Sequence, residues 1–548
     1  MPVTATKSKT SAAKAKARAK AKAKKLPVCT AKDLKTKKAK RRKCRVVTKT
    51  TKPATKAAAV TKTPIGTHPS SPTGPAAAPP ATSGDPTAWT PLPGVADQRT
   101  DGLRTYTGAF GTDQATRLLF RAGFGPLPGQ AEAFAALGVA AAVDRLVNPG
   151  PAQLVGPAPS GDFLVGGQFA PADKWGHGHL QWLDRIARST DQLGERMTLV
   201  MHDWIAMSAE KISGDQMIAS IGKLRNGWRG SFRQLMQSMT IDPGMLVWLD
   251  GLDSESSDPN ENYGRELMEM FTLGADRGAY TEDDIRENAR ALTGWVADWS
   301  EARGLYNFRF WPDRWDQTVK VLFGGTTYER RGNFKYNDVV DACIDHPLHP
   351  SFVALKLWSA FIPTPPTQQT LDELCALYRS SGEQLLPLVQ AILLHPDLYT
   401  GPSMTKSPVT YAGGLLRSKR AGIDTDAWTW VCDMMGQFLW YPPNVSGWNE
   451  RAWLNTTTYE GRWYAAQYFV NDGDVPTYEG STETPQQAVD AALAFWGTPV
   501  LSSDHRAMLL QHATDAMKTN LWSDAARRTL RQQTLRMLVV AAPDFQVS

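Results

Sequence analysis

Hydrophobic residues recur at intervals of three and four from about Asp113 onward, which is the spacing of one buried face of an α-helix. Only residues 305–336 alternate convincingly between apolar and polar positions, and this predicts a small β excursion. We therefore expect a mainly α protein with a large multi-helix globular body. The expected helices span residues 113–120, 130–146, 179–189, 191–208, 231–238, 337–344, 351–361, 368–381, 384–394, 427–435, 485–495, 504–517 and 524–541.

One further helix is expected from about Asn260 to Gly274, in a segment that is rich in acids, arginines and amides. Asparagine caps helix starts well, and glycine is a plausible stop. Glu261, Arg265 and Glu269 follow one another at i, i+4 spacing, so they share one face as an acid–base–acid ladder.

A second helix follows after a glycine-containing turn. Thr281 and Asp284 resemble a capping box in which aspartate replaces the usual glutamate. The helix that they open is expected to end at Gly294. The two helices together form a hairpin that concentrates more potential chemistry than any other part of the chain.

Two interpretations of this hairpin compete. In the functional one, Glu266 and Glu269 act as general acid and base or as oxygen ligands, with Arg265 or Arg121 holding an anionic substrate. In the structural one, the charges form a salt-bridge lattice whose members are individually weak where exposed. The residues alone do not decide between them.

A tryptophan-rich stretch, residues 435–458, contains two adjacent prolines that forbid helix and a glycine that permits a tight turn. It is expected to be an ordered aromatic loop. Exposed side chains there would form a sugar- or peptide-binding surface, whereas buried ones would fill the core beneath a long loop. The candidate partner- or ligand-binding residues are Trp440, Asn444, Trp448, Trp453 and Asn455.

The charge is divided unequally along the chain. Residues 1–62 carry 22 Lys and Arg against one acid, whereas the rest carries 39 basic and 53 acidic residues. We expect a disordered polybasic tail over 1–62, a Pro/Thr/Ser/Gly-rich linker over 63–112 and a helical domain over 113–548. Such a tail would bind polyanions non-specifically, whether wall polymer, anionic lipid or nucleic acid.

Several classes are disfavoured because their motifs do not occur. The chain has no GxSxG elbow, no GxxxxGK phosphate loop and no zinc-type cysteine spacing. No stretch is long and apolar enough for a transmembrane helix, and no signal-peptide core is visible. Cys29 and Cys44 bracket the polybasic run and could close a disulfide loop if the protein is exported.

Five motifs occur in an order that resembles the bacterial domain-of-unknown-function family 1800, over about residues 113–548. They read RAGFGP, PNENYGRELMEMFTLG, YTEDDIRENARALTGW, LWYPPNVSGWNERAWLN and PDFQ. The resemblance implies a mainly helical, uncharacterised protein that is exported, either secreted or in the envelope. It also implies a gene neighbour from a sulfatase-like secreted family, family 1501. It suggests one shared purpose for Arg121, Glu261, Asn262, Arg265, Glu266 and Glu269.

The chain departs from that family's pattern at positions where relatives tend to carry histidines. It has His202 followed by Asp203, and a tryptophan before Asp316. The side chains of His202, Asp203 and Asp316 could gather around a divalent cation together with Glu266 and Glu269, through oxygen ligands. Alternatively, His202 is a hydrogen-bonded core residue.

Two functions from different classes follow, and whether the protein is an enzyme stays open. The first is a cell-envelope interaction or assembly module that acts beside the sulfatase-like partner through its basic tail and aromatic loop. The alternative is an acid/base or metal-assisted hydrolase that uses the Glu-rich hairpin. Nucleic-acid binding through the tail ranks last, because the acidic body has no groove-reading motif.

Overall fold

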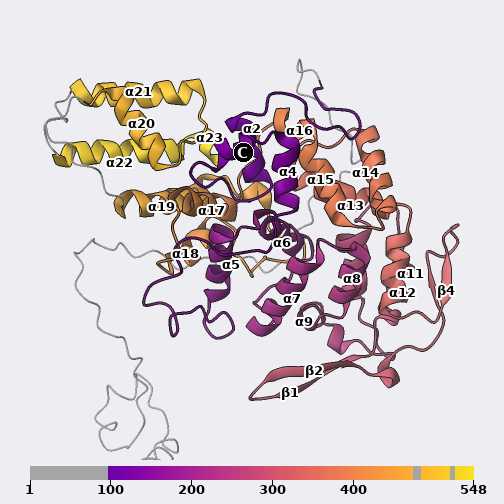
Figure 1. Ribbon diagram of the computed structural model, residues 1–548. Coiled ribbons are helices and arrows are strands. Elements are labelled where there is room, and N and C mark those ends of the chain that lie inside the picture. Colours follow the sequence, from indigo (N-terminus) through magenta and orange to yellow (C-terminus); the bar gives the residue numbers. More distant parts are fainter. Residues whose placement is uncertain (1–96, 473–482, 519–524) are drawn as a thin grey trace, which may run out of the picture. The chain divides into compact units, whose positions relative to one another are not determined.

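The computed structural model describes residues 97–472, 483–518 and 525–548. Figure 1 shows this part of the chain as a predominantly helical body. Its described residues include two small two-stranded sheets, so the expected mainly α fold is confirmed. The expected disordered tail and most of the linker lie outside the described residues. Within the described chain, no helix combines the length and apolar character that a membrane crossing needs.

The first part of the body is a run of helices whose positions largely follow the predicted ones. The predicted helix over 130–146 is instead two helices, because Gly138 has a φ of +74° that a helix cannot accommodate. The elements are α2 (Thr112–Arg121), α3 (Gln130–Ala135), α4 (Val139–Val147), α5 (His177–Arg188), α6 (Gln192–Trp204), α7 (Gly214–Gly227), α8 (Phe232–Thr240), α9 (Pro243–Trp248) and the 3-10 turn η3 (Gly251–Asp253).

The predicted helix hairpin forms as α10 (Glu261–Glu266), the π-helix η4 (Leu267–Thr272) and α11 (Glu282–Ala291). The predicted caps are confirmed: the Asn260 side chain accepts from a backbone N–H 2.8 Å away, and Thr281 and Asp284 cap each other's backbone. Gly274 and Gly294 both have positive φ. The π-helix was not predicted, and such turns occur often at functional sites.

Four short strands follow, in two antiparallel pairs. β1 (Trp295–Ser300) pairs with β2 (Gly304–Phe310), and β3 (Lys320–Leu322) pairs with β4 (Arg330–Gly332), with the turn η5 (Pro312–Arg314) between the pairs. The β excursion predicted near 305–336 is therefore present, but it begins earlier, at β1. In Figure 1 the β1–β2 ribbon lies at the edge of the helical body.

The rest of the body is again helical. The elements are α12 (Tyr336–Asp345), α13 (His349–Ser359), α14 (Gln368–Ser380), α15 (Leu385–Leu394), α16 (Pro396–Thr400), α17 (Pro408–Lys419), α18 (Ala427–Met434), η6 (Glu450–Ala452), α19 (Thr456–Asp472), α20 (Pro485–Phe495), α21 (Ser503–Lys518), α22 (Ala525–Ala541) and α23 (Pro543–Gln546).

Helices α7, α9, α16, α19 and α23 were not predicted. Helix α17 was not predicted either, since two central glycines weaken a helix in isolation. In the fold these glycines allow close packing, because a side chain at Gly413 would collide with Ile186 and one at Gly414 would crowd Phe120. Helix α17 thereby packs on α5, and α5 in turn contacts α6. The buried residues of all these helices form one hydrophobic cluster, within which α6 is buried along most of its length.

Candidate active site

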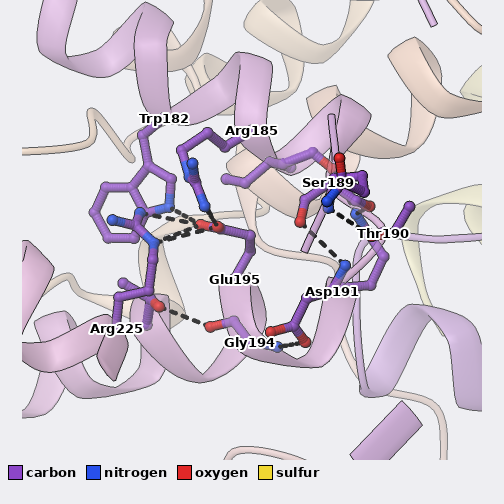
Figure 2. Close-up of polar contacts among 12 residues, drawn as sticks. Trp182, Arg185, Ser189, Thr190, Asp191, Gly194, Glu195 and Arg225 are labelled. Atoms are coloured by element: carbon purple, nitrogen blue, oxygen red, sulfur yellow. Dashed lines mark hydrogen bonds and ion pairs between the residues drawn. The ribbon is translucent and has the colours of Figure 1, made fainter. Parts of the chain in front are cut away.

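Helix α6 carries charged residues on two neighbouring faces. The charged residue on the first face, Glu195, has a structural role. Glu195 is 2% exposed, and its carboxylate accepts hydrogen bonds from Trp182, Arg185 and Arg225 at 2.9–3.2 Å. Figure 2 shows these three side chains converging on Glu195 from α5 and α7. A buried carboxylate with this many donors has little acceptor capacity left, so Glu195 ties three helices together.

A neighbouring face of α6 borders a cavity of about 290 Å³. Arg196, Leu199, Val200 and Asp203 line it, at the i, i+3, i+4 and i+7 positions that share one face of a helix. Arg196 is held in place by hydrogen bonds to the Thr410 hydroxyl at 3.0 Å and to a backbone carbonyl at 3.2 Å. Helix periodicity therefore directs one basic and one acidic side chain into the same space.

The tryptophan-rich loop closes the cavity over the end of α6. Gly447 has a φ of +82°, and a Cβ at this position would overlap the Asp203 carboxylate. The next residue, Trp448, donates its backbone N–H to Asp203 Oδ1 at 2.8 Å. The loop then brings Glu450 to the cavity, where this residue is exposed at the mouth. The glycine is required because the loop backbone lies directly against the carboxylate.

Helix α13 supplies the fourth charged group, Lys356. None of the four groups makes an ion pair with another described residue, although each lies within electrostatic range of two or more of the others. Burial raises the pKa of Asp203 to about 6, with Glu450 adding to the rise, and partial desolvation at the mouth also raises the pKa of Glu450. Burial lowers the pKa of Arg196 and of Lys356.

The tryptophans of the loop are core residues. Trp440, Trp448 and Trp453 are 5%, 6% and 8% exposed, so the expected surface of exposed aromatics is not formed by these three. The apolar area of three indoles favours burial beneath the loop. Trp448 and Trp453 nevertheless line the cavity. The predicted amides are exposed: Asn444 accepts from a backbone N–H inside the loop, and Asn455 accepts from the first turn of α19.

The helix hairpin contains the predicted ladder. Arg265 pairs with Glu261 at 3.3 Å, with Glu269 at 3.2 Å and with Glu282 at 2.8 Å, all on partly exposed side chains. Glu266 makes no hydrogen bond or ion pair within the described chain, and burial together with the nearby Glu269 raises its pKa to about 7. The hairpin thus combines a charge lattice with the unpaired, partly buried carboxyl of Glu266.

The hairpin also reaches the neighbourhood of the cavity. Trp204 lines the cavity and donates its indole N–H to the Met270 carbonyl of the π-helix at 3.0 Å. Glu269 and Met270 line an adjoining groove of about 490 Å³, which shares Lys356 and Ser359 with the cavity. The cavity and the groove therefore meet at α13.

Arg121 has a different environment from the one predicted for a substrate-holding residue. It is 1% exposed and donates to the backbone carbonyls of Phe361, Pro402 and Ser548. Burial lowers its pKa to about 8. These contacts connect α2 to three distant segments of the chain, which is the pattern of a structural arginine.

The three predicted metal ligands do not share one site. His202 is fully buried between the rings of Trp182 and Trp448, and burial lowers its pKa to about 3. Asp316 binds Arg290 at 2.8 Å, and although burial opposes the effect, hydrogen bonds from Arg290 and Thr318 lower its pKa to about 2. Across the described ranges, no three His, Cys, Asp or Glu side chains are grouped to hold a metal ion.

Sequence reasoning found Asp203 but missed Arg196, Lys356 and Glu450. The i, i+7 spacing of Arg196 and Asp203 was a usable signal. Glu450 stands inside the motif LWYPPNVSGWNERAWLN, although nothing local distinguishes it from a solvated acid. Lys356 carries no local signal, because only the packing of α13 brings it to the cavity.

Comparison with known proteins supports the resemblance noted above. Residues 117–547 match the family described as a protein of unknown function, DUF1800. No curated protein and no solved structure matches the chain. The matched range contains α6, α13, the hairpin and the tryptophan-rich loop, and so all the charged groups of the cavity. The chain belongs to the DUF1800 family of uncharacterised proteins.

Proposed function

We propose that the protein is a hydrolase that performs acid–base chemistry in the cavity at the end of α6. The observation that carries this proposal is the presence of two carboxyl groups and two cationic groups around one cavity, without ion pairs among them. Charges that only held helices together would be paired, as Glu195 is paired on the same helix. Unpaired, partly desolvated charges are characteristic of catalytic sites.

The geometry supports a division of roles. Asp203, which is ionised above about pH 6, accepts a proton from water as the water oxygen bonds to an electrophilic carbon. The protonated Asp203 then donates this proton to the leaving oxygen as its bond to that carbon breaks, and the Glu450 carboxylate at the mouth favours the charged forms of Arg196 and Lys356. Arg196 and Lys356 donate hydrogen bonds to the oxygen on which negative charge develops. The second proton transfer thereby returns Asp203 to its ionised form.

The hairpin residues Glu266, Glu269 and Arg265 are assigned a supporting role in this proposal. Arg265 is already occupied by three carboxylates, and Glu269 is one of them. The unpaired Glu266 is the hairpin's remaining candidate for a proton-accepting group. A catalytic role for the hairpin itself stays a prediction, which the variants below also test.

The test is hydrolysis of a panel of p-nitrophenyl esters, glycosides, phosphates and sulfates by the full chain. The variants are Asp203→Asn, Glu450→Gln and Glu266→Gln, and the matched control is Asp173→Asn, which removes an exposed carboxylate that does not line the cavity. We expect turnover of at least one class, reduced about 100-fold or more in the Asp203 and Glu450 variants. Absence of turnover for every class, or equal turnover in Asp203→Asn, would contradict the proposal.

We retain a second candidate function, the envelope interaction module beside a sulfatase-like partner. The observation that favours it is an aromatic patch that one exposed tryptophan, Trp175, forms with residues of the tryptophan-rich loop. Trp175 is 66% exposed and lies 5.2 Å from the ring of Phe438, which stacks on Tyr441 at 4.9 Å. Co-purification of a family-1501 protein with the full chain, lost in Trp175→Ala, would support this function. Equal recovery with both proteins would contradict the role of the patch.

A further inference from the structure

The groove that adjoins the cavity is mainly apolar. It runs between the π-helix, α13 and the proline-rich segment after α13, and Met270, Phe352, Leu355 and Ile362 line it. Pro363, Pro365 and Pro366 complete one wall. Because prolines have no backbone N–H, this wall offers few hydrogen-bond donors to a bound molecule. Such a surface suits hydrocarbon better than a polar chain.

The polar side chains of the groove are largely engaged with other partners. Arg277 donates to the Leu273 and Leu348 carbonyls and to the Ser351 hydroxyl. Glu269 is paired with Arg265. These contacts hold the charged ends of the wall residues to the protein and leave the apolar lining to contact a ligand.

Lys356 is the exception, and it stands where the groove meets the charged cavity. Its ammonium makes no hydrogen bond or ion pair within the described chain and lies 5.9 Å from the centre of the Phe352 ring. Ser359, one turn further along α13, lines both spaces as well. The junction therefore presents a cationic group to a ligand whose apolar part occupies the groove and whose polar end enters the cavity.

We propose that the substrates are aliphatic acyl esters, with the acyl chain in the groove and the carbonyl group beside Lys356. This inference rests on the proposed function, because it assigns a substrate class to the same cavity. A carbohydrate fits less well, since sugars stack on open aromatic faces and the two cavity tryptophans are buried. Hydrolysis would leave a carboxylate beside the Lys356 ammonium, so alkyl carboxylates are probes for the site.

The test is calorimetric titration of the full chain with acetate, butanoate, hexanoate, octanoate and decanoate. Measurements are made at pH 5.5, where Asp203 is largely protonated and does not repel the probe. We expect Kd to fall about fourfold for each added methylene until the groove is filled. The blocking variant is Ala275→Trp, at an exposed position that lines the groove. The control is Ala133→Trp, at an exposed position on α3.

The expected result is that Ala275→Trp binds short carboxylates like the wild type but loses the chain-length dependence. A Kd that does not depend on chain length, or that is unchanged by the blocking variant, would overturn the acyl-chain proposal. The two proposals can fail separately. Chain-length-dependent binding without Asp203-dependent turnover would refute the hydrolase proposal and support the acyl-chain proposal. Asp203-dependent turnover that does not vary with chain length would support the hydrolase proposal and refute the acyl-chain proposal.

Discussion

Replacement of Asp203 by asparagine is expected to stabilise the protein at neutral pH. Asparagine keeps an oxygen that can accept the Trp448 backbone N–H, now at 2.8 Å, and it removes a negative charge from a desolvated position. If a carboxyl group served only the fold, its removal would be expected to lower the free energy of unfolding. Removal of a residue that is retained for chemistry is expected to raise the free energy of unfolding, because active sites trade stability for function.

The magnitude follows from the raised pKa. The pKa of Asp203 is about 6 in the folded protein, against about 3.9 in an unfolded chain. The folded state therefore binds more protons between these values, and stability falls as pH rises from about 4 to 6. Above pH 6 the ionised Asp203 lowers the free energy of unfolding by about 3 kcal/mol, and below pH 4 this loss of stability vanishes. Removing it should raise Tm by about 3 °C in a folded body of this size.

The assay is differential scanning calorimetry of the wild type, Asp203→Asn and the surface control Asp173→Asn at pH 4.0 and pH 7.5. We expect Asp203→Asn to exceed the wild-type Tm at pH 7.5 and to match or fall below it at pH 4.0. The control should differ from the wild type by less than about 1 °C at both pH values. A Tm difference that is the same at both pH values, or a lower Tm at pH 7.5, would refute the reasoning.

Three further substitutions have expected outcomes. Glu195→Gln should destabilise the protein by about 3–5 kcal/mol in urea unfolding, since it breaks two buried ion pairs; a loss below about 1 kcal/mol would contradict the structural role of Glu195. Glu266→Gln should stabilise by about 2 kcal/mol at pH 8 and by nothing at pH 4, because the raised pKa penalises the ionised form; a pH-independent effect would argue against this. Gly447→Ala should lower stability by about 1–3 kcal/mol and reduce turnover, because its Cβ overlaps the Asp203 carboxylate; wild-type behaviour in both assays would contradict the loop geometry.

The elements that were predicted correctly are those with local causes. The caps at Asn260 and at Thr281 involve residues two or three positions apart, so their hydrogen bonds could be anticipated from the sequence alone. The Arg265 ladder likewise depends only on helix periodicity. Several helices were missed, and α7 is one of them although it begins with a capping box formed by Ser213 and Gln216. For the π-helix after Glu266 and for α17 the reason is that packing rather than local preference determines both.

The candidate site was only partly predictable, since its four charged groups come from three distant segments. Asp203 drew attention through its histidine neighbour, although in the structure His202 lies among aromatic rings and Asp203 faces the cavity. Lys356 and Glu450 are ordinary charged residues until the fold places them opposite α6. The sequence also could not show that Glu195 is fully hydrogen-bonded whereas its neighbour Arg196 faces the cavity, because the two roles depend on what packs against each face of α6.

The most direct test of the acid–base cavity is the pH profile of kcat/KM, from pH 4 to pH 9, with an ester that the full chain hydrolyses. The account predicts that the wild-type profile rises with a midpoint near pH 6, as Asp203 ionises, and that this limb disappears in Asp203→Asn. A profile with the same midpoint in the wild type and in Asp203→Asn would contradict the account, because the titrating base would then lie elsewhere.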